Sequence, residues 1–442
     1  VQPDESGKML PMLAESVEPN DTFDSWTIKI REGVKFHDGT KLDAEVVKNN
    51  LDAYRGKYDG RSPLLFVFVL QNIKAVDVTD PMTVTITTKT PWPALPSFLY
   101  SSGRLGMSAQ AQLDSKDNCD KDLIGTGPFK LKEWKLNDHF TAVKNPDYWQ
   151  KDADGTQLPY LDEIEYRPVP DTDSRVEGVQ TGQFDMIHTN GGEAVSQLQP
   201  LADSGTINMI ANSDAAEVTY LMANEAKAPF DNLDARKAVA YGINREEFKK
   251  LRAAGLQDVA SGPFAPGNLG YLEDTGFPEF DVAKAKEHAA AYKKATGKDL
   301  SFTMSYAADA STKISAELLQ SQLADSGIEM KLTSTDQAAL IDRAIGGDFE
   351  LAYFRNHPGG DPDNQYVWWH SSSPVNFGKI NDPQVDKALD DGRVESDEAK
   401  RAGIYEGMNE RFADQVHNIW LIWSLWTVSS QPNVHGVFGP DV

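Results

Sequence analysis

The sequence predicts an α/β protein made of two or three packed units. Its 442 residues exceed what one hydrophobic core usually organises. Strand-like and helical segments alternate between residues 300 and 354 in the order β-α-β-α-β, which favours a sheet with parallel pairs. The chain before about residue 110 is instead rich in strands and turns, as is typical of an α+β unit.

The first part of the chain is predicted to contain one hairpin, one helix and two further strands. Residues 26–30 alternate in polarity as a strand does, and a Glu-Gly turn leads into residues 34–36, which completes a hairpin. Asp43 is a favourable N-cap for a helix whose apolar residues recur at helical spacing. Two strands are expected on either side of a Thr-Asp-Pro turn, at 73–78 and 83–88.

Further elements follow from the same signals along the rest of the chain. Strands are expected at 129–134, 140–143, 164–168, 184–187 and 218–222, and helices at 172–179, within 231–254, at 281–296 and at 396–415. The β-α-β-α-β run comprises strands at 300–306, 328–333 and 351–354 and helices at 312–326 and 337–346. A last strand is expected at 420–429, and if it crosses back to the first lobe, the chain passes between lobes twice, which suits hinged closure.

Charge and hydropathy exclude several kinds of partner. The chain has 67 acidic and 43 basic residues and a formal net charge of −24. Nucleic acid and anionic membrane surfaces are bound by basic surfaces that release counterions, and this excess of acid opposes such binding. The most apolar window, residues 419–428, is far shorter than the roughly 20 residues that cross a bilayer. These observations exclude partners without naming a function.

The sequence provides no recognisable catalytic, metal or cofactor motif. Cys119 is the single cysteine, so it forms neither an internal disulfide nor a CxxC pair. We interpret the His-Asp-Gly run at 37–39 as a turn rather than as half of a catalytic or metal site. Residues 152–155 lack the other ligands of a calcium loop, and residues 125–128 lack the Lys-Ser/Thr of a phosphate loop. We therefore expect no enzyme activity, no metal and no cofactor.

Four stretches occur in an order and spacing that are similar to those of a known family. They are residues 26–47, which include REGVKFHDGT, then GTGPF at 125–129 with NPDYW at 145–149, LPYLDEI at 158–164, and NLDARKAVAYGINR at 232–245. Together they resemble the signature of the family 5 bacterial extracellular solute-binding proteins, the oligopeptide- and dipeptide-binding type. The resemblance extends over almost the whole chain.

The resemblance implies a two-lobed fold of the periplasmic-binding-protein type (type II, cluster C), with an extra α+β subdomain in the first lobe. Residues 1–110 would then form the extra subdomain, residues 111–222 and 428–442 the first lobe, and residues 223–427 the second lobe. Family members usually carry several dozen residues before the segment that matches residues 11–16 here. We therefore expect this chain to be a trimmed form.

The resemblance also implies a function. Members are substrate-binding components of ABC importers, which capture a peptide or peptide-like solute between the lobes and deliver it to membrane permease subunits. We therefore expect an exported monomer, periplasmic or at the cell surface, whose signal sequence is not in this chain. Three alternatives stay open: the same scaffold binding an oligosaccharide or opine-like solute, a sensor or chaperone on that scaffold, and a hydrolase of saccharides or peptides.

The best candidate for a ligand site is the loop at 354–364. It follows a predicted strand at the carboxyl end, where α/β units place ligand-binding loops, and the alternative is a plain surface loop. The polar residues expected to face a ligand are Arg355, Asn356, His357, Asp361 and Asp363. The resemblance implies an Asp that pairs with the ligand's free amine three residues before the acid-Pro pair, and Pro358 occupies that position here. It also places Arg355, an anion-pairing or stacking side chain, where an aromatic is common.

Tryptophans and one asparagine complete the candidate set. Trp368 and Trp369 are adjacent and cannot share one environment in regular structure, so one of them is expected to face the ligand and the other the core. Tryptophans also occur at 420, 423 and 426, and most of these are expected in the core. Asn224 matches the family's first lobe-crossing segment, where it either offers an amide to the ligand or serves only in the hinge.

Overall fold

The structure, a computed structural model, describes residues 1–4, 7–63, 65–101, 104–116, 121–212, 217–357 and 360–437. Cys119 and Pro358 lie outside the described residues. By its internal contacts the chain divides into two compact units, residues 1–171 with 435–442 and residues 172–434. This division does not address the lobes, whose boundaries stay a prediction.

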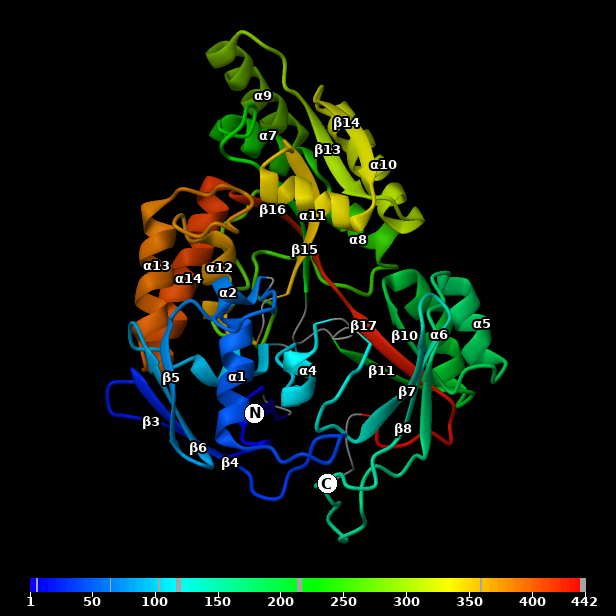
Figure 1. Ribbon diagram of the computed structural model, residues 1–442. Helices are drawn as coiled ribbons and strands as arrows, with labels where there is room; N and C mark the ends of the chain where they lie inside the picture. Colours follow the sequence, from blue (N-terminus) through cyan, green and yellow to red (C-terminus); the bar gives the residue numbers. More distant parts are fainter. Residues whose placement is uncertain are drawn as a thin grey trace. The chain divides into compact units, whose positions relative to one another are not determined.

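In its described residues, the first unit contains two larger antiparallel sheets, a two-stranded pair and four α-helices (Figure 1). One sheet has the order β3-β4-β6-β5, with bounds Ala14–Pro19, Ser25–Ile30, Thr83–Thr88 and Ile73–Asp80. The other has the order β7-β8-β9, with bounds Phe129–Lys135, His139–Lys144 and Glu163–Tyr166. A short pair, β1 and β2, spans Gln2–Pro3 and Met9–Leu10. The helices are α1 (Ala44–Tyr54), α2 (Phe66–Val69), α3 (Leu95–Tyr100) and α4 (Gln110–Asp114).

The predicted hairpin at residues 26–36 is wrong. β4 pairs with β3 and β6, whereas residues 34–36 contribute only an isolated bridge between Lys35 and Lys41. Gly33, with φ +80°, turns the chain so that Val34 and Phe36 insert into the core instead of extending a sheet. The expected His-Asp-Gly turn is present, and the side chain of Asp38 accepts a hydrogen bond from the Thr40 amide at 2.9 Å.

The second unit is organised around a five-stranded sheet with the order β14-β13-β15-β12-β16. The bounds in that order are Glu329–Thr335, Ser301–Ala307, Leu351–Asn356, Val218–Ala223 and Asn418–Trp423. β13 pairs in parallel with both β14 and β15, which confirms the predicted β-α-β-α-β unit with parallel pairing. The crossover helices are α10 (Ala310–Asp325) and α11 (Gln337–Gly346).

A three-stranded sheet with the order β10-β17-β11 belongs to the same unit. Its strands are Met186–Asn190, Trp426–Ser430 and Asn208–Asn212. The single strand predicted at 420–429 is therefore two strands, β16 and β17, in different sheets (red in Figure 1). Ser424 and Leu425 form the connection, so the chain does pass from the five-stranded sheet to a sheet built from residues 186–212.

Most helices of the second unit begin at an Asn or Asp whose side chain accepts a backbone amide hydrogen bond. The caps are Asn232, Asn244, Asp281, Asp309, Asp336, Asp382 and Asp397. Such caps satisfy amide groups that have no partner inside the helix. The remaining helices are α5 (Thr172–Gln180), α6 (Gly192–Asp203), α7 (Leu233–Gly242), α8 (Arg245–Arg252), α9 (Val282–Thr296), the 3-10 helix η2 (Pro362–Gln365), α12 (Tyr366–Trp369), α13 (Pro383–Val394) and α14 (Glu398–Gln415).

Among the described residues, none of the helices combines the length and the apolar character that a membrane crossing requires.

A buried charge cluster joins several elements at one end of the five-stranded sheet. His417, just before β16, contacts Glu225 through Nδ1 at 2.6 Å and Asp382 through Nε2 at 3.2 Å. Arg236 and Arg411 contact the same two carboxylates. Burial by itself lowers the pKa of His417, but the hydrogen bonds to Asp382 and Glu225 outweigh burial and raise it. The two carboxylates therefore favour the charged form of the imidazole.

We predict that His417→Gln lowers the free energy of unfolding more at pH 6 than at pH 9. The unfolded-state pKa of a histidine is about 6.5. Because the folded-state pKa of His417 is raised, its contribution is fully present below pH 6.5 and is lost as pH rises through the folded-state value. Breaking a buried charge pair costs about 3 kcal/mol, and urea unfolding at both pH values measures the loss.

His288→Gln is the matched control, because His288 contacts Asp234 at 2.8 Å at a more exposed position. The free energy of unfolding of His288→Gln should be lower than that of the unsubstituted protein by less than about 1 kcal/mol at either pH. An equal loss at pH 6 and pH 9 for His417→Gln would mean that the side chain contributes packing alone.

Candidate functional site

The predicted ligand loop, residues 354–364, leaves the five-stranded sheet at the end where most strands of the sheet have their carboxyl ends. β12 is antiparallel to both β15 and β16, while β13, β14 and β15 run in parallel. The carboxyl ends of four strands therefore meet the amino end of β12. The chain enters β12 at Glu217 and leaves β16 at Ser424, also at this end. We call this place the sheet end.

Arg355 lies at the sheet end and is partly open to solvent. It is the penultimate residue of β15 and pairs across the sheet with Thr219 of β12. Its side chain is 46 % exposed, and Nη1 lies 3.4 Å from Oε2 of Glu217, whose side chain is 15 % exposed. One nitrogen and one oxygen at this distance form a loose ion pair, which leaves much of the guanidinium fork available.

Asn356 and His357 continue from Arg355 into the loop. Asn356 donates a hydrogen bond through Nδ2 to Oε1 of Gln365 in η2, at 2.6 Å. This bond fixes the end of β15 against the helical turn that follows. The His357 side chain is exposed. The role of both residues toward a ligand stays a prediction, and the neighbouring Pro358 is outside the described residues.

Asp361 and Asp363 form ion pairs inside the unit, the first partly buried and the second buried. The two oxygens of Asp361 accept hydrogen bonds from Nη1 and Nη2 of Arg401 at 2.8 and 2.6 Å. Asp363 is fully buried, and Nε of Arg393 contacts its carboxylate at 2.8 Å. Burial by itself lowers the pKa of Arg401, but the Asp361 carboxylate outweighs burial and raises it. These two carboxylates already serve the loop's own structure.

Trp368 and Trp369 have different environments, as their adjacency in α12 requires. Trp369 is 3 % exposed and packs against Phe412 and Trp420, with ring centroids 4.7 and 6.3 Å away. Trp368 is partly exposed and contacts Phe377 in an edge-to-face arrangement at 5.6 Å. Of the two, Trp368 is the one that has surface to offer a ligand.

The other tryptophans divide between the core and the connection from β16 to β17. Trp420 is fully buried, and Trp423 is buried against Tyr271, with ring centroids 5.9 Å apart. Trp426 is only partly buried and stacks on His188 of β10, at 4.8 Å with an interplanar angle of 5°. Trp426 therefore packs within the three-stranded sheet.

Asn224 is far from this group along the sheet. It follows β12, so it lies at the opposite end from Glu217. Its Nδ2 donates to the carbonyl oxygens of Gly347 and Phe349 at 3.1 and 3.0 Å, and its Oδ1 accepts from the Ala226 amide at 3.2 Å. These contacts favour the structural alternative over an amide offered to a ligand.

The sequence reasoning did not identify Glu217 or Ser424. Glu217 precedes a strand and Ser424 follows one, and neither position forms part of a motif. Their proximity depends on the antiparallel pairing of β12 with β16, in which Val218 lies opposite Trp423. To predict that Glu217 and Ser424 are neighbours, one would need the register between two strands about 200 residues apart in the chain. No local sequence pattern encodes this register.

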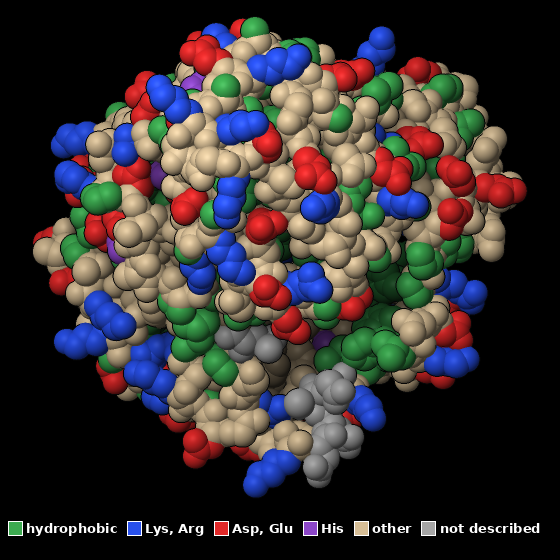
Figure 2. Space-filling view, turned by 90° about the horizontal axis from the view of Figure 1, so that it is seen from above, with side chains coloured by type: hydrophobic (Ala, Val, Ile, Leu, Met, Phe, Trp, Pro, Cys, Tyr) green, Lys and Arg blue, Asp and Glu red, His purple; other side chains and the backbone are tan. Residues whose placement is uncertain are grey.

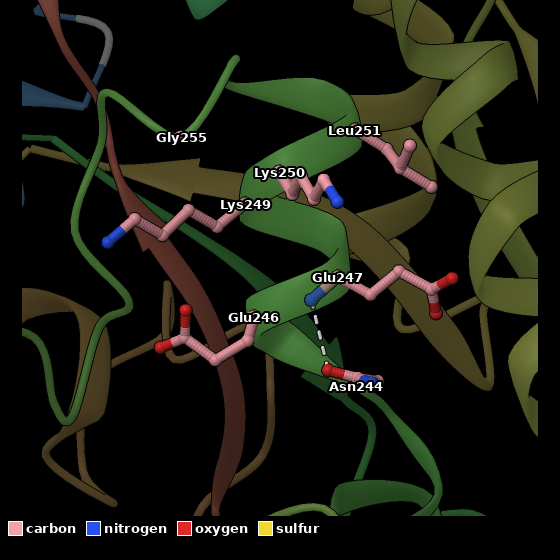
Figure 3. A pocket seen from close by; sticks show the side chains of 7 residues that line it. All are labelled: Asn244, Glu246, Glu247, Lys249, Lys250, Leu251 and Gly255. Carbon is pink, nitrogen blue, oxygen red and sulfur yellow. Dashed lines mark hydrogen bonds between the residues drawn. The ribbon is translucent and has the colours of Figure 1, made fainter.

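A surface depression of about 530 Å³ lies along α8 (Figure 3). Its lining residues are Asn244, Glu246, Glu247, Lys249, Lys250, Leu251 and Gly255. Oδ1 of Asn244 already accepts the Glu247 amide, as the dashed line in Figure 3 marks, and Lys249 contacts Asp258 at 3.4 Å. The depression carries both signs of charge without a set of groups converging on one point. In the described residues, no three His, Cys, Asp or Glu side chains are placed to hold a metal ion.

We predict that Trp369→Ala destabilises the protein far more than Trp368→Ala. Removing the buried indole leaves a cavity and should lower the free energy of unfolding by about 3–5 kcal/mol. Removing the partly exposed indole of Trp368 should lower the free energy of unfolding by roughly 1–2 kcal/mol. Urea unfolding followed by circular dichroism compares the two variants. Equal losses would contradict the assignment of Trp369 to the core and Trp368 to the surface.

Comparisons with known proteins place the fold and the family. The sequence profile of the bacterial extracellular solute-binding proteins, family 5 (middle), matches residues 8–378. The structure of AgaA from A. tumefaciens R10, in complex with agropinic acid, has a TM-score of 0.86 and 25 % identity, covering 98 % of this chain and 87 % of that one. The oligopeptide-binding protein AppA from Bacillus subtilis, in complex with a nonapeptide, has a TM-score of 0.82 and 23 % identity, with coverage of 98 % and 87 %. These structures confirm the predicted fold class.

The sequence relatives agree with the structural ones. The glutathione-binding protein GsiB of Salmonella paratyphi A is 31 % identical over 333 residues, which are 75 % of this chain and 62 % of that relative. The match thus spans less than two thirds of the relative's length. Because the family profile matches most of the sequence, the chain belongs to the bacterial extracellular solute-binding proteins of family 5.

Proposed function

We propose that this protein is the substrate-binding component of an ABC importer and that it captures a peptide or peptide-like solute between two lobes. The observation that carries the proposal is family membership, because the profile of solute-binding proteins matches residues 8–378. The structure adds a supporting feature, since the chain enters and leaves the five-stranded sheet at the end where Arg355 lies. A ligand held there contacts the segments about which a hinge would move.

The mechanism needs binding but no chemistry. Two lobes that sample open and closed arrangements are shifted toward closure by a ligand that interacts better with the closed one. A membrane permease would then recognise the closed, loaded protein. The family consists of solute-binding proteins, which supports a protein that releases its ligand unchanged. Turnover of a bound solute would contradict this part of the proposal.

The ligand class we favour is a peptide or peptide-like compound that carries a carboxylate. The relative GsiB is named as a glutathione-binding protein, and AppA was solved with a nonapeptide. AgaA was solved with agropinic acid, which keeps a non-peptide, opine-like solute as the second candidate. Arg355 supports a carboxylate in either case, because a guanidinium matches carboxylate geometry. The structure adds no comparable support for an oligosaccharide.

The proposed setting is outside the cytoplasm, as a monomer that meets a permease and not nucleic acid. The family is extracellular by description, and the formal net charge of −24 opposes polyanion binding. On the face seen in Figure 2, basic and acidic side chains are interspersed instead of gathering into a basic stripe. A nucleic-acid surface would require the opposite distribution.

We predict that a cognate solute raises the melting temperature by several degrees. A ligand at a hundredfold excess over its Kd stabilises the folded state by about 2.7 kcal/mol. Thermal scans against glutathione, dipeptides, a nonapeptide, agropinic acid and an oligosaccharide series separate the candidate classes. Stabilisation by oligosaccharides alone would replace the peptide proposal with a sugar-binding one.

We predict that Arg355→Gln weakens binding of a carboxylate-bearing solute about 10- to 100-fold, because a charge-assisted hydrogen bond is lost. Isothermal titration calorimetry measures the change. Arg343→Gln is the matched control, since Arg343 is exposed in the last turn of α11, away from the carboxyl end of β15. Unchanged affinity in Arg355→Gln would move the site away from the sheet end.

A further inference from the structure

Three arginine–carboxylate pairs lie in or beside the loop that follows β15, and one of them differs from the others. Arg401 holds both oxygens of Asp361 at 2.8 and 2.6 Å, and Arg393 holds Asp363 at 2.8 Å. Arg355 contacts Glu217 through a single pair of atoms at 3.4 Å. The side chains of the first two pairs are at most 15 % exposed, whereas the Arg355 side chain is 46 % exposed. The Arg355 pair is therefore the one that a solvent-borne anion can reach and compete for.

Glu217 is also fixed to the chain segment that leaves the sheet. Its carbonyl oxygen accepts a hydrogen bond from the Ser424 amide at 2.7 Å, between β16 and β17. Next to it, the hydroxyls of Thr219 and Ser424 lie 3.4 Å apart. The backbone of Glu217 thus stays in place whatever its side chain does. The carboxylate can exchange partners without dissolving the sheet end.

The overall charge opposes an anionic ligand, so a local cation would favour its binding. At a formal net charge of −24, the protein as a whole repels a carboxylate. If an arginine had no partner in the ligand-free protein, it would bind small anions unselectively. An arginine that is already loosely paired with a carboxylate binds only an anion that interacts with it more strongly than this carboxylate does. A ligand carboxylate that meets the guanidinium through two parallel hydrogen bonds is such a partner.

We propose that Glu217 is an internal substitute for a ligand carboxylate, which leaves Arg355 when the carboxylate of the solute binds. This inference rests on the proposed function and deepens it, because it assigns the ligand class and the residue that selects it. Neutral analogues of the same solute cannot displace Glu217, because they offer no negative charge to the guanidinium. Selectivity for the acid over its ester then arises from competition at one arginine.

Glu217→Gln tests the proposal, because it keeps the size of the side chain and removes its charge. The probes are glutathione, agropinic acid and the diethyl ester of glutathione, measured by isothermal titration calorimetry. We expect the acid that binds the unsubstituted protein to bind Glu217→Gln about three- to fivefold more tightly. The ester should bind weakly and equally to both proteins.

A double-mutant cycle with Arg355→Gln separates competition at the arginine from a general effect of charge. The gain from Glu217→Gln should vanish in the Arg355→Gln background, where no guanidinium remains to compete for. A gain that persists there, or an acid that binds Glu217→Gln more weakly than the unsubstituted protein, would overturn the inference and leave the proposed function standing. If none of the probes, nor any solute of the thermal screen, binds the unsubstituted protein, both are overturned.

Discussion

The hydrogen bond from the Ser424 amide to the Glu217 carbonyl, 2.7 Å long, joins the two places where the chain meets the end of the five-stranded sheet. It extends the antiparallel pairing of β12 with β16 by one step, just before β17 enters the three-stranded sheet. The loop after β15 starts beside it, because β15 pairs with β12 on its other side. The passage of the chain between the two sheets and the start of the loop that we propose as the ligand site therefore share one location.

Around this location the acidic and basic residues have distinct tasks. Asp361 is paired with Arg401 and Asp363 with Arg393, and these ion pairs give the loop a fixed shape. Charges buried in this way are costly to leave unpaired, so they are poor candidates for exchange with a ligand. Arg355 is more exposed and only loosely paired. A rigid base with one exchangeable charge is a suitable arrangement for selective binding.

GsiB, AgaA and AppA share a family or a fold with this chain, yet their ligands are glutathione, agropinic acid and a nonapeptide. A common scaffold therefore accommodates different solutes, and the side chains at the site decide among them. For this chain, we propose that Arg355 and its partner Glu217 take part in that decision.

The sequence by itself determined the family, through a resemblance carried by four motifs. It also determined the β-α-β-α-β unit, most strands and helix starts such as the one at Asp43, because these follow from local spacing and from caps. It placed Arg355 in a loop just after a strand that ends at residue 354, whereas in the structure β15 continues to Asn356 and includes Arg355. Only the tertiary structure separated Trp369 from Trp368, divided the last strand into β16 and β17, and joined Asp361 and Asp363 to arginines. It likewise brought Glu217 to Arg355, which lies 138 positions along the chain. Pairings between distant residues depend on strand register and packing, which a local sequence pattern does not encode.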